Sequence, residues 1–209
     1  MRRMMWIVMT LLAISIAGYV LVSYGAMGAA NMPLIQGKLE QMTLNSFYYA
    51  VLYIHIIASV VALVIGPFSL SRTFRENNLR RHRLLGKVYM VGVLLGGVSG
   101  MYLAILANGG IAAKLGFGTL SILWLITAYL ALWNIKNKRV VYHQRWMIRN
   151  YALTFAAVTL RLYIILVLAT MGGVYFEAAY PIIAWICWMP NLIVAGILIR
   201  RHTKPTSVR

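Results

Sequence analysis

Two of the four histidines, His82 and His143, stand in similar sequence surroundings. Each begins a short segment, HRLLGKVY and HQRWMIRNY, that contains basic residues and a tyrosine and leads into a long apolar stretch. This pattern places both imidazoles at a similar depth, near one face of a membrane. Neutral imidazoles from facing helices can ligate haem iron on both axial sides. We therefore expect a b-type haem between these histidines, with Arg145 and Arg149 receiving its propionates. The alternative is a pair of interfacial histidines beside lipid headgroups.

A second set of polar residues lies inside apolar stretches. Arg161 is roughly 15 Å from the outer end of its stretch and His55 about 10 Å from that of its own, at 1.5 Å per residue. Asn191 follows Pro190 at a similar level. A charged arginine this deep is costly and marks a functional site by default. We expect Arg161 and His55 to act on a ligand in an outer cavity into which Asn191 also points. Alternatively, Arg161 is structural and bonds backbone carbonyls.

The composition shows which elements must position these residues. Of the 209 residues, 62% are hydrophobic and 11% are charged, and the mean hydropathy is +0.78. A soluble domain is nearer half apolar and a quarter charged, so a water-soluble globule is excluded. About 20 apolar residues cross a membrane as a helix. Six stretches qualify, and we predict one all-α domain, 1–209, built as a six-helix membrane bundle, with spans at about 6–27, 47–70, 84–107, 115–135, 146–171 and 179–199.

The positive charges are concentrated on one side of the predicted spans. The net charge is +17, and 17 of the 20 lysines and arginines fall on one side of the six stretches. Lys38 and Lys114 fall on the other side, and Arg161 lies within a stretch. The positive-inside rule then places both termini in the cytoplasm. The orientation of the protein in the membrane thus explains the net positive charge, and no nucleic-acid partner is needed. The basic loops favour contact with anionic membrane lipids.

Other features limit the chemistry. Gly92, Gly96 and Gly100 share one helix face, which allows another helix to approach closely. The single cysteine, Cys187, excludes a disulfide within the chain. No phosphate-binding Gly-Lys-Ser/Thr loop and no HExxH pattern occurs in the sequence. No carboxylate lies in any of the six stretches, which argues against a carrier that uses an intramembrane Asp or Glu and against a magnesium or calcium site.

Four segments together resemble a bacterial family of integral membrane proteins, domain of unknown function 2306. They are HIIASVVALVIGPFSLS, LRRHRLLGKVY, HQRWMIRNYALTFAAVTLRLY and AWICWMPNLIVAGILIRR, and the resemblance covers roughly residues 50–201. It implies a small helical bundle in a bacterial cytoplasmic membrane and supplies little chemistry. The sequence is more loosely similar to cytochrome b561-type bundles, which hold two haems between histidine pairs. At most one such pair is complete here.

Two kinds of function follow from these residues. The first is a redox protein with haem between His82 and His143 and a quinone near Arg161, which would donate hydrogen bonds to the quinone oxygen while His55 relays protons. The second is a binding or transport protein in which Arg161 holds the head of a lipid or small anionic amphiphile. A structural or assembly subunit is a third alternative. The substrate and the oligomeric state stay open.

Overall fold

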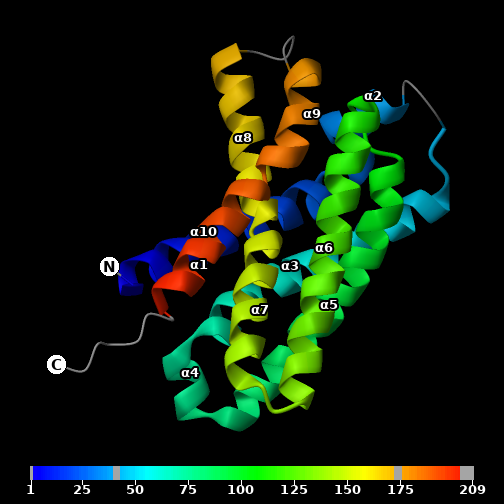
Figure 1. Cartoon of the computed structure of the whole chain (residues 1–209). Helices are drawn as coiled ribbons and strands as arrows, with labels where there is room; N and C mark the ends of the chain where they lie inside the picture. Colours follow the sequence, from blue (N-terminus) through cyan, green and yellow to red (C-terminus); the bar gives the residue numbers. More distant parts are fainter. Residues whose placement is uncertain (1, 40–42, 172–175, 203–209) are drawn as a thin grey trace.

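The computed structural model describes residues 2–39, 43–171 and 176–202, and all of its regular elements are helices (Figure 1). This confirms the predicted all-α fold for the described residues. The elements are α1 (Arg2–Leu21), a π-helical turn η1 (Val22–Ala26), a 3₁₀ turn η2 (Ala29–Asn31), α2 (Pro33–Leu39), α3 (Ser46–Leu70), α4 (Arg72–Asn77), α5 (Leu79–Ile105), α6 (Gly110–Lys136), α7 (Val140–Thr154), α8 (Ala156–Met171), α9 (Phe176–Ile186) and α10 (Met189–His202).

Six helical segments in the described residues are long and apolar enough to cross a membrane, as predicted. They run over Arg3–Ala26, Ser46–Leu70, Leu79–Ile105, Gly110–Lys136, Val140–Thr170 and Phe176–Arg201. Large apolar side chains such as Ile57, Leu94 and Val98 are exposed on the outer faces of these helices. Such faces need lipid around them.

The helix ends differ from the predicted span ends because polar residues also form helix. We expected the third span to begin at residue 84, but α5 begins at Leu79. Asn78 caps it, since its side-chain oxygen accepts a hydrogen bond from the Arg81 backbone N–H at 2.9 Å. His82 and His143 consequently lie in the first turns of α5 and α7 and not before them.

The glycine face of α5 packs against α3, as the spacing predicts. A Cβ atom added to Gly92 would lie 2.9 Å from the Ala58 carbonyl oxygen, and one added to Gly96 would lie 3.0 Å from Ser59 Oγ. Only glycine permits such an approach between the two backbones. The neighbouring helix α6 runs alongside α5 and completes the centre of the bundle (Figure 1).

The fifth and sixth spans are each interrupted. Phe155 separates α7 from α8, and Cys187 and Trp188 separate α9 from α10. Pro190 lies in the first turn of α10, where proline is tolerated because the early N–H groups have no helical partner. The break in the sixth span therefore lies just before Pro190. Pro181 lies inside α9, and α3 continues past Pro67 to Leu70.

The short helix α2 lies at the end of the bundle opposite α4 (Figure 1). Asn108, in the connection between α5 and α6, donates a hydrogen bond from Nδ2 to the Leu34 carbonyl oxygen at 3.0 Å. Tyr53 donates from its hydroxyl to the Tyr24 carbonyl at 3.2 Å and accepts from the Ala29 N–H at 3.3 Å. These contacts hold α2 and the turns before it against the bundle.

Candidate functional site

A cavity of about 260 Å³ lies among the helices on the α2 side of the bundle. Residues of α1, α2, α3, α5, α6, α7, α8 and α9 line it, and most are apolar, among them Ile16, Val20, Leu52 and Leu160. Ligand pockets typically range from about 300 to 1,000 Å³ and combine apolar walls with a few polar groups. This cavity has that character at the small end of the range.

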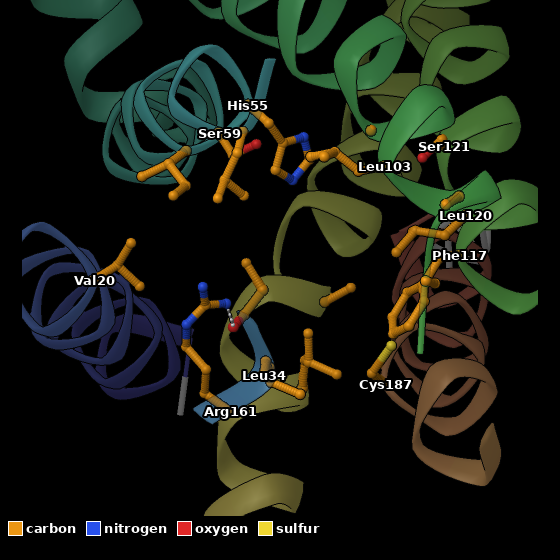
Figure 2. A pocket seen from close by; sticks show the side chains of 18 of the residues that line it. Val20, Leu34, His55, Ser59, Leu103, Phe117, Leu120, Ser121, Arg161 and Cys187 are labelled. Atoms are coloured by element: carbon orange, nitrogen blue, oxygen red, sulfur yellow. Dashed lines mark hydrogen bonds between the residues drawn. The ribbon is translucent and has the colours of Figure 1, made fainter. Parts of the chain in front are cut away.

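His55 projects into the cavity from α3 (Figure 2). Its Nδ1 lies 2.8 Å from the Gly96 carbonyl oxygen. A carbonyl only accepts, so Nδ1 carries the proton and donates it. A Cβ atom added to Gly100 would lie 3.1 Å from His55 Cε1, so the glycine face of α5 leaves room for the ring. The helix packing and the orientation of His55 therefore depend on the same glycines.

Arg161 projects into the same cavity from α8, on the side opposite His55 (Figure 2). Its Nη1 donates to the Ala157 carbonyl oxygen at 2.8 Å, one turn earlier in α8. A guanidinium has five N–H donors. No other hydrogen bond joins Arg161 to the described residues, so most of its donors have no partner among them.

No carboxylate of the described residues forms an ion pair with Arg161. Glu177 is exposed in the first turn of α9 and forms no ion pair with Arg161. Glu40 lies outside the described residues. Arg161 interacts electrostatically with the phenols of Tyr24, Tyr19 and Tyr180 and with His55. No aspartate or glutamate is present among the described residues that line the cavity.

Lys38 is a cavity residue that the sequence pattern placed only in an outer loop. It is 6% exposed and lines the cavity from α2, with its ammonium 5.7 Å from the centre of the Tyr48 ring. Burial lowers the Lys38 pKa, and the nearby charge of Lys114 lowers it further. The sequence feature that could have identified Lys38 as a cavity residue is its spacing of three residues from Ile35 and four from Leu34. This spacing puts the three side chains on one face of a helix.

Two serines add neutral polar groups near His55. Ser59 lies one turn after His55 in α3, and its buried Oγ has no hydrogen-bond partner among the described residues. Ser121, from α6, also lines the cavity, and its Oγ would be 2.9 Å from a Cβ atom on Gly100. The spacing of four between His55 and Ser59 was visible in the sequence, whereas Ser121 had no comparable signal.

The histidine pair lies elsewhere. His82 and His143 are close enough to interact electrostatically, and Arg75 of α4 acts on both. The Nδ1 of His143 donates to the Ala131 carbonyl at 2.8 Å, while the buried Nδ1 of His82 has no partner among the described residues. Neither histidine is among the residues that line the cavity. No cluster of three or more His, Cys, Asp or Glu occurs in the described part of the chain.

The two arginines expected near haem propionates stack on rings of their own helix. The guanidinium carbon of Arg145 lies 5.3 Å from the centre of the Tyr142 ring, and that of Arg149 lies 4.8 Å from the centre of the Trp146 ring. Both pairs have the spacing of three that brings side chains together on a helix. These cation–π contacts occupy one face of each guanidinium.

Asn191 does not line the cavity, contrary to expectation. Its Nδ2 lies 3.2 Å from the Ala152 carbonyl, 3.1 Å from the Cys187 carbonyl and 3.1 Å from Thr159 Oγ1. The amide is used to bond groups around the two helix breaks, where carbonyls lack their usual helical partners.

The six apolar helices define a multi-pass membrane protein. The chain belongs to the family described as predicted membrane protein, DUF2306, which matches residues 52–199. No curated protein and no solved structure matches the chain. The looser similarity to cytochrome b561-type proteins therefore stays a resemblance.

Proposed function

We propose that the protein binds an anionic amphiphile in the cavity, with Arg161 and Lys38 facing the acidic head. The observation that carries this proposal is the presence of two cationic side chains on one apolar cavity whose described lining contains no carboxylate. Charges removed from water are stable only when they are compensated. A bound anion supplies that compensation.

The lining fits both parts of such a ligand. A guanidinium donates two parallel hydrogen bonds to a carboxylate or phosphate, and Arg161 has donors to spare. Lys38 adds a compact charge without a fixed geometry. Apolar walls of α1 and α3, including Val20 and Leu52, take the hydrocarbon part. Water leaves on binding, which contributes favourable free energy in proportion to the apolar area covered.

Native mass spectrometry after purification in a mild detergent tests this proposal. The wild-type protein should carry a small anionic amphiphile. Arg161→Gln should lose most of it, and Arg161→Lys should keep part because the charge stays. Arg83→Gln, which removes an exposed arginine far from the cavity, is the matched control and should keep it. The proposal fails if Arg161→Gln retains the same ligand at the same occupancy, or if the bound ligand is uncharged.

A redox function is the second candidate, favoured by the proximity of His82 and His143 and by the Nδ1 of His82, which has no partner among the described residues. These two histidines would hold the iron of a b-type haem, which supplies one-electron chemistry when bound. A quinone would then occupy the cavity near Arg161 and His55. The hydrogen bond from His143 Nδ1 to Ala131 has the form that orients a ligating imidazole.

A visible spectrum of the purified protein tests this second candidate. It requires a Soret band that shifts on reduction by dithionite and that is absent from His82→Ala and His143→Ala. A colourless protein produced with ample haem would exclude it, and would leave the anion-binding proposal intact.

A further inference from the structure

The polar groups of the cavity are of two kinds. The cations are Arg161 and Lys38, on α8 and α2. The neutral polar groups include His55 and Ser59 of α3 and Ser121 of α6 (Figure 2), and the lining also contains Asn108, Thr154 and several tyrosines. A purely hydrocarbon tail would leave His55 Nε2 and the hydroxyls of Ser59 and Ser121 without a partner on the ligand, and a buried polar group without a partner costs about 1–3 kcal/mol.

The hydrogen bond to Gly96 decides what His55 offers to a ligand. Because Nδ1 donates its proton to the carbonyl at 2.8 Å, only Nε2 is left to face the cavity. A neutral imidazole has a lone pair at that nitrogen and accepts one hydrogen bond. The neutral form suits this site, since a further positive charge in the apolar cavity that Arg161 already enters would be costly. His55 Nε2 is therefore satisfied by a hydrogen-bond donor on the ligand.

Resting on the anion-binding function proposed above, we propose that the ligand is a hydroxylated anionic amphiphile whose hydroxyl group donates a hydrogen bond to His55 Nε2. The two serines extend this recognition. Ser59 lies next to His55 on the same face of α3, and its hydroxyl has no partner among the described residues. It can donate to the oxygen of the same hydroxyl group. The acidic head and the hydroxyl thus bind separate parts of the lining.

The cavity limits the size of the ligand. The cavity volume of about 260 Å³ is near the lower end of the range for ligand pockets, which favours a small ligand. Tyr48, whose ring lies 5.7 Å from the Lys38 ammonium, precedes His55 by seven residues of α3, which is about 10 Å along the helix axis. This rise sets the scale of the separation between Lys38 and His55. A medium-chain hydroxy acid has this size, and octanoate and 8-hydroxyoctanoate are matched probes.

The test measures the dissociation constants of octanoate and of 8-hydroxyoctanoate by calorimetry, for the full chain in lipid nanodiscs. One neutral hydrogen bond predicts that wild type binds 8-hydroxyoctanoate about 3- to 10-fold more tightly than octanoate. In His55→Leu the ratio should fall to about one. In His55→Gln it should recover in part, because the amide oxygen can replace the acceptor.

The failures of the two proposals give different results. If wild type binds both probes equally and Arg161→Gln weakens both, anion binding holds and the hydroxyl inference is wrong. The hydroxyl inference is also wrong if His55→Leu keeps the full preference. If neither probe binds wild type, or Arg161→Gln changes nothing, the anion-binding proposal itself fails.

Discussion

The side-chain amide nitrogen of Asn191 lies 3.2 Å from the carbonyl oxygen of Ala152, so the start of α10 is joined to the end of α7. The same nitrogen contacts the Cys187 carbonyl at the break between α9 and α10. One side chain thus connects both interrupted spans. Arg161 follows Ala152 by nine residues, beyond the break at Phe155 and in α8, so these contacts also help to set the direction in which α8 carries Arg161 toward the cavity.

Replacing Asn191 should loosen this junction. Asn191→Ala removes hydrogen bonds to two carbonyls and to Thr159 and should lower the free energy of unfolding by about 1–3 kcal/mol. Thermal unfolding in detergent measures the change. Asn137→Ala, which removes an exposed bond to the Trp133 carbonyl, is the control and should change stability by less than about 0.5 kcal/mol. Equal effects of the two substitutions would contradict the role given to Asn191.

The contact between α3 and α5 predicts a contrast between two glycines of one helix. Gly92→Ala forces a Cβ atom against the Ala58 carbonyl oxygen and should destabilise the protein by about 1–3 kcal/mol. Gly86→Ala meets nothing within 4 Å and should be neutral or stabilising by up to about 1 kcal/mol through helix propensity. Chemical unfolding of both variants checks the prediction, which a neutral Gly92→Ala would refute.

The lowered pKa of Lys38 predicts a pH dependence of anion binding. Lys38 is cationic only below its pKa, which burial and Lys114 place under the ordinary lysine value of about 10.4. Octanoate binding should therefore be strongest at neutral pH and weaken as the pH rises through this lowered pKa. Lys38→Arg keeps its charge throughout and should remove the decline. Wild-type binding that stays level up to pH 11 would show that Lys38 does not contact the anion.

The charge distribution predicts the orientation of the protein. A reporter enzyme active only in the cytoplasm, fused after Arg209, should be active, and the same reporter inserted beside Lys114 should be inactive. The opposite pattern would show that the protein has the reverse orientation in the membrane. It would leave the cavity unchanged but move it to the other half of the membrane.

The sequence predicted the bundle well because apolar stretches and the spacing of Gly92, Gly96 and Gly100 act locally. It also singled out Arg161 and His55, since a charge and an imidazole inside apolar stretches are conspicuous. Lys38 was missed because a lysine in a polar connection looks solvated, and only the packing of α2 buries it. Asn191 was assigned to the cavity because depth along a helix does not determine the direction of a side chain near a break.

The most direct test of anion binding in the cavity is photolabelling with an octanoate analogue that carries a diazirine, followed by peptide mapping. Binding in the cavity predicts labels on lining residues such as Val20, Leu52 and Leu160, displaced by excess octanoate and lost in Arg161→Gln. Labels confined to lipid-facing residues such as Ile57 and Leu94, unchanged by Arg161→Gln, would contradict the proposal.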